Sequence, residues 1–219
     1  MTRGRPFVRV KLAMSLDGRT ALASGESRWL TGEAARQDVQ RLRARSSAIL
    51  TGSGTVLADD PGLDVRLPEA ERQPLRVILD TALRIPPTAK TLHLPGSALI
   101  FTAVADPAAQ KPLRAAGADI AVVPQVASGL DLRAVMAELA RRECNEIHAE
   151  CGPTLAGALL QAGLMDELVI YMAPILLGDK ARGLFQLPEL AQMSERTELE
   201  VVETRAVGRD WRLTLRLSQ

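Results

Sequence analysis

Cysteine and histidine are scarce in this chain of 219 residues, which contains two of each. Cys144 and Cys151 lack the C-x-x-C spacing typical of redox or metal sites, and they provide no framework of disulfide pairs. We therefore expect both to be reduced, small residues of the protein interior. The histidines, His93 and His148, offer little material for a zinc site.

An excess of one charge and a long apolar run are also missing. The sequence has 27 basic and 26 acidic residues, a formal net charge of +1. This balance argues against nucleic acid or an anionic membrane surface as the main partner. No stretch reaches the ~18 apolar residues of a membrane span, and the N-terminus has no apolar signal segment. We expect a cytoplasmic protein, in which a few local arginines would hold any anionic ligand.

What is present favours one α/β domain over residues 1–219. The chain is 47% hydrophobic and 24% charged, as in ordinary globular proteins, and no linker or repeat divides it. Hydrophobic patterns predict strands at 7–14, 48–51, 75–80, 98–102, 118–123, 146–150 and 166–173. Helical patterns lie at 31–45, 107–116, 132–143 and 155–160, the first of them with Thr31 as its N-cap.

The C-terminal strands have a different connection. Glu198–Val207 and Trp211–Leu217 are joined by Gly208-Arg209-Asp210, which predicts an antiparallel hairpin. The alternation of strands and helices before it predicts a mixed, mostly parallel sheet flanked by helices.

A glycine turn after the strand at 146–150 is the most informative local motif. Glu150 ends the strand, Gly152 turns the chain, and Pro153 lies in the first turn of the next helix. Free N–H groups and the positive helix end would form a cradle for a diphosphate, with Gly152 and Gly157 permitting close approach. A glycine turn that merely begins a helix is the alternative.

The same strand contains half of a zinc motif. His148-Ala149-Glu150 matches the H-x-E of nucleoside deaminases, which also need a downstream P-C-x-x-C to bind the metal. Cys151 is the last cysteine of the chain, so that motif cannot be completed. We expect no metal.

The first strand carries Lys11 between Val10 and Leu12. A lysine in such a strand usually keeps its ammonium in water. Acidic turns at 15–20 and 57–61 could nevertheless bring carboxylates to strand ends, where ligands of open sheets bind. Taken alone, the aspartates of the second turn are ordinary turn formers.

Four of these segments together resemble one family. The segments are Lys11–Arg19, Ser24–Trp29, Thr55–Pro61 and Glu150–Leu155. They resemble, in the same order, the reductase domain of the bifunctional riboflavin-biosynthesis deaminase-reductase, of the dihydrofolate-reductase-like superfamily. The similarity runs from Val8 to about Leu217. The family's zinc deaminase domain is not in this sequence, which therefore corresponds to a free-standing reductase or to the C-terminal part of a longer protein.

The resemblance implies a dihydrofolate-reductase-like fold, NADPH as cofactor, and reduction of 5-amino-6-(5-phosphoribosylamino)uracil to its ribitylamino product. It assigns to the cofactor Ala13, Trp29, Thr55, Asp59, Thr81, Gly152, Pro153, Thr154, Leu155, Ala156, Gly157 and Ala158. It assigns to the substrate Ser27, Arg43, Leu63, Arg66 and Glu150.

Roles follow from the chemistry that this reaction needs. Lys11 and Asp59 would handle protons while the sugar opens, and Glu150 would accept hydrogen bonds from the pyrimidine. Arg43 and Arg66, helped by Ser27, would hold the 5′-phosphate; without that requirement, both arginines would be placed on a solvated surface.

Three residues need a further statement. Trp29 packs beside the cofactor or in the core. Arg84 and Ser53 are our candidates for reading the 2′-phosphate of NADPH.

Three alternatives stay open. A related reductase acts on the diamino-pyrimidinone before deamination. Dihydrofolate reductase itself needs a pterin-binding acid on the first helix, where Glu33 and Asp38 lie in an arginine-rich context that we expect to be exposed. A non-catalytic scaffold could use the apolar strand Leu168–Met172 as a dimer interface. We expect a homodimer with a deaminase partner or domain.

Overall fold

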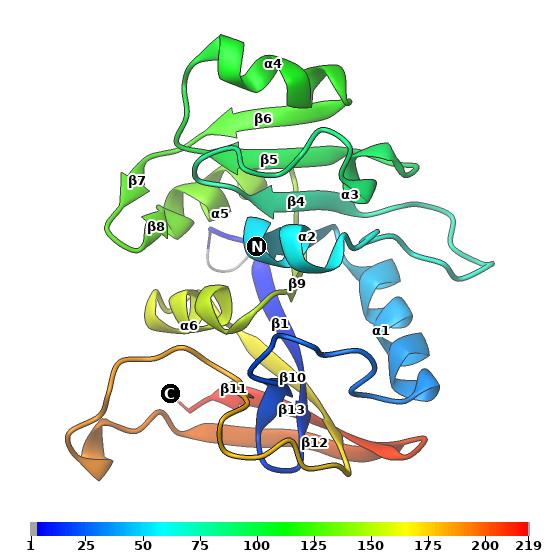
Figure 1. The fold of residues 1–219 in the computed structure, drawn as a ribbon, viewed down its shortest axis with the longest axis vertical. Helices are drawn as coiled ribbons and strands as arrows, with labels where there is room; N and C mark the ends of the chain where they lie inside the picture. The colour runs from blue at the N-terminus through cyan, green and yellow to red at the C-terminus, as the bar shows by residue number, and fades with distance from the viewer. Residues whose placement is uncertain (1–3, 219) are drawn as a thin grey trace. The chain divides into compact units, whose positions relative to one another are not determined.

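The structure is a computed structural model that describes residues 4–218. The chain forms two compact units. Within the described residues, unit 1 comprises 4–7 and 40–150, and unit 2 comprises 8–39 and 151–218. Each unit therefore combines segments that are distant in sequence. The two units are described separately below, with the element labels used in Figure 1.

Unit 1 is built on parallel strands. They are β9 (Glu146–Glu150), β3 (Ala48–Gly52), β4 (Leu75–Leu79), β5 (Ala98–Thr102) and β6 (Ala118–Val122), paired in that order. All five residues of β5 are buried, and so are all but the first of β4. Continuous burial of this kind is typical of parallel strands that are covered on both faces.

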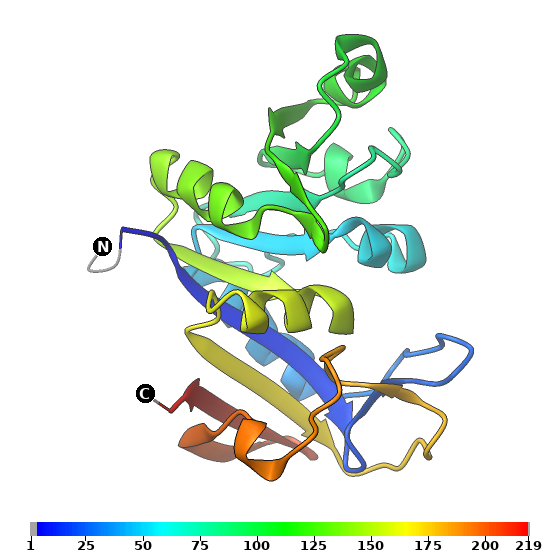
Figure 2. The ribbon, with the colours of Figure 1, turned by 90° about the vertical axis from the view of Figure 1, so that its left-hand side faces the viewer.

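Helices cover both faces of the unit 1 strands (Figure 2). They are α2 (Ser53–Asp59), α3 (Lys90–His93), α4 (Pro107–Ala115) and α5 (Leu132–Arg141). Val56 of α2, Leu92 of α3 and Leu113 of α4 pack into one cluster with Ile78 and Ile100 of the strands. A short hairpin, β7 (Gln125–Val126) and β8 (Gly129–Leu130), precedes α5.

Unit 2 contains four long strands in the order β12-β13-β10-β1. They are β1 (Phe7–Ser15), β10 (Glu167–Ala173), β12 (Leu199–Val207) and β13 (Asp210–Leu217). The strands β1 and β10 run parallel, whereas β13 is antiparallel to both β10 and β12. The turn between β12 and β13 contains Gly208 at φ +62°, a left-handed conformation that favours glycine.

The remaining elements of unit 2 are short strands, helices and one 3₁₀ turn. They are β2 (Arg19–Ala21) paired with β11 (Arg182–Gly183), α6 (Pro153–Gln161), a 3₁₀ turn (Met193–Glu195), and the first part of α1 (Glu33–Arg45), up to Val39. In Figure 2 α6 lies in front of β1 and β10.

The predicted fold is confirmed: strands and helices alternate, most strands are parallel, and an antiparallel hairpin closes the chain. The N-cap at Thr31 is wrong, because α1 begins at Glu33. The Gly32 N–H donates instead to Asp210 Oδ2 at 2.7 Å, and the Thr31 carbonyl accepts from Arg36. The hydrophobic pattern did not predict α3, β2, β7, β8 or β11, which are short. Within residues 4–218, each helix is too short or too polar to cross a membrane.

Candidate active site

The carboxylate of Glu150, at the end of β9, is held by Arg43 in unit 1. The Arg43 guanidinium donates from Nε to Oε1 at 2.5 Å and from Nη2 to Oε2 at 3.0 Å. Its Nη1 donates to the backbone oxygen of Asp64 at 2.8 Å. Arg43 is 8% exposed. The planar guanidinium matches a carboxylate through two parallel bonds, so this pair fixes the orientation of Glu150.

A second nitrogen-containing side chain lies beside Glu150. His148 is on the same face of β9, is fully buried, and places Nε2 at 3.2 Å from Glu150 Oε1. Burial alone would raise the pKa of Glu150. The charge of Arg43 and the neighbouring His148 lower it by more, so the pKa falls well below its usual range. Glu150 is therefore a charged, oriented acceptor at a strand end.

The loop after α2 positions Leu63 and Arg66. Leu63 is buried and has a left-handed φ of 54°. The backbone N–H of Arg66 donates to Gln40 Oε1 at 2.9 Å. The backbone is thus fixed while the Arg66 side chain is exposed. Of the two arginines predicted to bind phosphate, Arg66 presents its guanidinium to solvent and Arg43 does not.

The predicted residues Thr55 and Asp59 both lie on α2. They are four residues apart, which places them on the same side of a helix. Asp60 ends the helix in a left-handed conformation, and its Oδ1 accepts from the Lys90 N–H at 2.8 Å. Both neighbouring aspartates are exposed, and the Asp60 side chain stabilises the turn through this bond.

The candidates for the 2′-phosphate of NADPH contact one another in unit 1. Arg84 donates from Nη2 to Ser53 Oγ at 3.1 Å. Arg84 is exposed and Ser53 is buried at the start of α2. Thr81, three residues before Arg84, is half-buried, and its carbonyl accepts from Thr102 Oγ1. The Arg84 guanidinium can therefore meet a ligand while the Ser53 hydroxyl orients it.

The N-terminus of α6, in unit 2, has the features expected of an anion cradle. Gly152 is its N-cap and has no side chain to cap the helix, and Pro153 occupies the first turn. Apart from its own chain neighbours, a Cβ built on Gly152 would have no atom of the described residues within 4 Å. The first-turn N–H groups and the helix dipole suit a phosphate in that open space.

Gly157, the second glycine of this motif, has a structural role. A Cβ on Gly157 would lie 2.1 Å from the backbone oxygen of Gln186. The Gln186 N–H donates to the Pro153 oxygen at 3.1 Å, and Thr154 Oγ1 donates to Gln186 Oε1 at 2.8 Å. Gly157 therefore permits close packing of the chain around Gln186, which sequence reasoning did not predict. Leu155 and Ala158 on this helix are half-buried, and Ala156 is buried.

Other predicted residues of unit 2 lie on β1 and the loop after β2. Lys11 and Ala13 are half-buried on the same face of β1, and Ser27 is half-buried in the loop. Trp29 is 68% exposed, and the Arg36 guanidinium lies 4.6 Å from the centre of its ring. Core packing is therefore wrong for Trp29, and its contact with the cofactor stays a prediction.

The acidic turn after β1 is a structural feature. Ser15 donates to the Asp17 carboxylate, which also accepts the N–H groups of Leu177 and Gly178. The Ser15 hydrogen bond, with help from these two backbone donors, lowers the pKa of Asp17 to about 2. Asp17 thus holds two loops of unit 2 together.

The structure brings together some predicted residues and leaves one grouping untested. Arg43 meets Glu150, and Arg84 meets Ser53. Lys11 belongs to unit 2, so its convergence with the unit 1 carboxylates stays a prediction. The expectation that Asp38 is exposed is wrong: it is 5% exposed. Its helix is rich in arginine, but its own partners come from distant strands, which the local pattern does not reveal.

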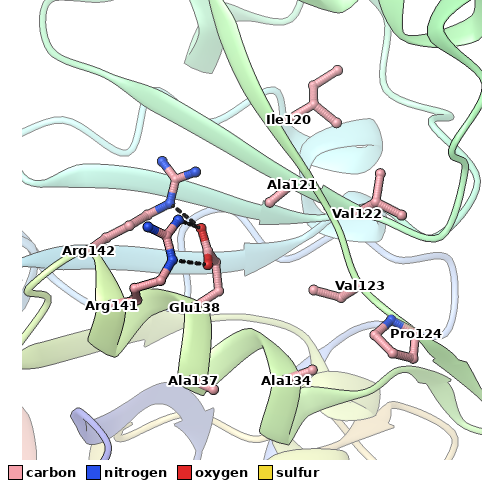
Figure 3. A pocket seen from close by; sticks show the side chains of 10 residues that line it. All are labelled: Ile120, Ala121, Val122, Val123, Pro124, Ala134, Ala137, Glu138, Arg141 and Arg142. Carbon is pink, nitrogen blue, oxygen red and sulfur yellow. Dashed lines mark hydrogen bonds and ion pairs between the residues drawn. The ribbon is translucent and has the colours of Figure 1, made fainter.

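A hollow of about 590 Å³ in unit 1 lies away from these residues. Figure 3 shows that β6 and α5 line it, with the Glu138 carboxylate paired to Arg141 and Arg142 at one end. None of the predicted site residues is among its lining residues. Within residues 4–218, no group of three or more His, Cys, Asp and Glu side chains could hold a metal.

The fold and these sites define a class of protein: an α/β protein of the dihydrofolate-reductase-like type, with an open helix N-terminus and an oriented acid at a strand end. The chain belongs to the RibD C-terminal domain family, whose model matches residues 6–213. The riboflavin biosynthesis protein RibD of Escherichia coli K12 is 44% identical over 226 residues, which cover 96% of this chain and 59% of that protein.

Solved structures agree. RibD of Acinetobacter baumannii has a TM-score of 0.90 at 39% identity, over 100% of this chain and 60% of that one. A Thermotoga maritima protein, named diaminohydroxyphosphoribosylaminopyrimidine deaminase/5-amino-6-(5-phosphoribosylamino)uracil reductase, has a TM-score of 0.82 at 26% identity, over 99% and 58%. The chain thus spans about 60% of the length of these relatives.

Proposed function

We propose that this chain is an NADPH-dependent reductase that converts 5-amino-6-(5-phosphoribosylamino)uracil to 5-amino-6-(5-phosphoribitylamino)uracil. The observation that carries the proposal is the charged Glu150, oriented by Arg43 at a strand end, in a chain of the RibD C-terminal domain family. The Thermotoga maritima relative is named for this reductase activity together with a deaminase activity.

The residues of the chain fit a pyridine nucleotide. The open space beside Gly152 and the uncapped start of α6 suit the diphosphate. The exposed indole of Trp29 offers a flat surface, and Arg84 offers a guanidinium for the 2′-phosphate. Thr55, Asp59 and Thr81 complete the proposed contacts of unit 1, and Ala13 adds one from β1. The bound cofactor supplies the hydride.

The protein's own contribution is to bind, orient and move protons. The cyclic glycosylamine of the substrate must open to an imine before C1′ can accept a hydride. We assign the accompanying proton transfers to the ammonium of Lys11 and the carboxylate of Asp59, because such transfers need a group within hydrogen-bond reach. Correct placement of C1′ at ~3–3.5 Å from the hydride donor is the remaining requirement.

Substrate recognition is divided between an acid and an arginine. The charged carboxylate of Glu150 accepts hydrogen bonds from the N–H groups of the pyrimidine. Since two sides of the Arg43 guanidinium are engaged by Glu150 and Asp64, we assign Arg43 to the positioning of Glu150. The exposed Arg66, with the Ser27 hydroxyl and the Leu63 turn, is left to contact the 5′-phosphate.

The proposal also covers the deaminase partner, the extent of the domain and the oligomeric state. The relatives carry sequence beyond the matched part, and one of them is named as a deaminase as well, so we propose that a deaminase domain or partner supplies the substrate. We further propose that residues 1–219 act as one reductase domain, since the family model crosses both units, and that the enzyme is a cytoplasmic homodimer.

The consumption of NADPH with two purified pyrimidines tests the function. The deaminated uracil compound and the diamino-pyrimidinone differ at one exocyclic position. We expect turnover on the uracil compound and much lower kcat/KM on the other. The reverse order would mean that the diamino-pyrimidinone is the substrate. No consumption of NADPH with either compound would reject the reductase proposal.

A further inference from the structure

A row of polar side chains crosses all four long strands of unit 2. Pairing places Tyr171 of β10 opposite Arg212 of β13, and Arg212 opposite Arg205 of β12. Lys11 of β1 pairs with Val169, two residues before Tyr171, so its side chain lies on the same face. Alternate residues of the same strands, such as Val10 and Leu168, form a buried apolar face.

One carboxylate from α1 accepts hydrogen bonds from three side chains of this row. Asp38 Oδ2 accepts from the Tyr171 hydroxyl at 2.6 Å and from Arg212 Nη1 at 3.1 Å. Arg205 Nη2 donates to both Asp38 oxygens, at 2.9 and 2.8 Å. Tyr171 is fully buried and Asp38 nearly so. A buried carboxylate with this many donors is rigidly held, because each donor would be costly to leave unsatisfied.

The tyrosine connects this network to Lys11. The Lys11 ammonium lies 5.8 Å from the centre of the Tyr171 ring, within the range of a cation–π interaction. Burial, and then the hydrogen bond and charge of Asp38, raise the pKa of Tyr171. The hydroxyl therefore keeps its proton and remains the donor to Asp38, which fixes the tilt of the ring against which Lys11 rests.

We propose that Tyr171 and Asp38 are positioning residues for Lys11: the hydrogen bond between them fixes the ring that places the Lys11 ammonium. The charged groups around the ring are Lys11 of β1, Asp38 of α1, Arg205 of β12 and Arg212 of β13. The catalytic consequence rests on the proposed reductase function, but the placement of Lys11 does not.

The test uses the Tyr171→Phe variant, which keeps the ring and removes the hydroxyl. The chain has four lysines, so Lys11 can be compared with the exposed Lys90, Lys111 and Lys180 in one sample. The relative rate of acetylation by acetic anhydride, measured by peptide mass spectrometry, reports the environment of Lys11 without any substrate. We expect this rate to rise in Tyr171→Phe, and to rise further in Tyr171→Leu, which also removes the ring.

Activity gives the second measurement. In Tyr171→Phe we expect kcat to fall about five- to tenfold, the cost of one hydrogen bond, while the KM for NADPH stays within about twofold. Thr214→Val is the matched control, since the Thr214 hydroxyl is buried on the same face of β13 and makes no hydrogen bond in the described part of the chain. It should change neither quantity.

Two outcomes separate the claims. The positioning role is wrong if two quantities in Tyr171→Phe, the rate of Lys11 acetylation and kcat, equal those of the unsubstituted protein and of Thr214→Val. If the unmodified protein consumes no NADPH, the proposed function fails, and the acetylation rates alone then decide whether Tyr171 places Lys11.

Discussion

Arg43 and Glu150 lie 107 residues apart in the sequence and form a two-bond ion pair in the interior of unit 1. The pair explains why a half-buried carboxylate at the end of β9 is charged. Arg43 in turn is anchored by the carbonyl of Asp64, in the same loop that carries Arg66. The acid proposed to read the pyrimidine and the loop proposed to hold the phosphate are therefore linked by one guanidinium.

Arg43→Met should reverse the pH dependence that Glu150 gives to the stability of the protein. In the unmodified protein the pKa of Glu150 lies below its unfolded value, so its stabilising contribution is present above about pH 4.3 and is lost as the pH falls through the folded pKa. Without Arg43, burial remains and raises the pKa of Glu150. A raised pKa makes stability fall as the pH rises through it, so the free energy of unfolding should be lower by about 3–5 kcal/mol at neutral pH.

Urea unfolding between about pH 4 and 8 measures this effect. The matched control is Arg45→Met on the same helix, because Arg45 is exposed and pairs with Glu146 at 3.0 Å. A surface pair of this kind contributes about 0–1 kcal/mol. Equal losses in the two variants would contradict the special role of the Arg43–Glu150 pair.

The two glycines of the α6 motif should respond differently to substitution. Gly152→Val introduces a side chain into open space at φ −77°, so we expect a largely intact fold and NADPH binding that is weaker by about tenfold or more, since a lost bond to a charged phosphate costs about 1.5–3 kcal/mol. Gly157→Ala forces a methyl group against the Gln186 carbonyl and should destabilise the fold by about 1–3 kcal/mol. Calorimetry of NADPH binding and thermal unfolding separate the two. Unchanged NADPH affinity in Gly152→Val would place the cradle elsewhere.

Arg66→Met should weaken recognition of the substrate phosphate. One lost charge-assisted hydrogen bond costs about 1.5–3 kcal/mol, which lowers kcat/KM by about one to two orders of magnitude. The loss should largely vanish with a dephosphorylated substrate, which lacks the contact from the start, and NADPH affinity should hardly change. Arg72→Met, an exposed arginine a few residues later, is the control. Equal losses on both substrates would mean that Arg66 has a structural role.

Arg84→Met should reduce the preference for NADPH over NADH. The exposed guanidinium of Arg84 is oriented by the Ser53 hydroxyl. Removal of the guanidinium should therefore weaken the binding of NADPH about tenfold or more and leave the binding of NADH unchanged. Ser53→Ala should have a smaller effect in the same direction, because it removes only the orienting partner. Dissociation constants for both nucleotides provide the measurement. A parallel loss for NADH would assign Arg84 to another part of the cofactor.

Much of this could be predicted from the sequence, and the exceptions have a common cause. Strands such as Ala98–Thr102 and the hairpin around Gly208 were predictable because their signals are local: a buried apolar run and a turn with the correct residues. The pairing of Arg43 with Glu150 and of Asp38 with Tyr171 joins residues 107 and 133 positions apart, and no local pattern carries that information.

Short elements were missed for a related reason. The α3 helix has four residues, too few for a hydrophobic period to be recognised. Family motifs found the candidate site residues, but they did not distinguish Gly152, which faces open space, from Gly157, which faces Gln186. That distinction depends on a chain segment that packs on α6 from a distant part of the sequence.

In the proposed reaction a hydride passes from NADPH to C1′ of the ribosylamino-pyrimidine. The most direct test is a turnover with NADPH that carries deuterium at both C4 positions, followed by mass spectrometry of the ribitylamino product. We expect one deuterium per product molecule, located at C1′, whichever face of the nicotinamide is used. NADPH oxidation with no deuterium at C1′ would contradict this expectation.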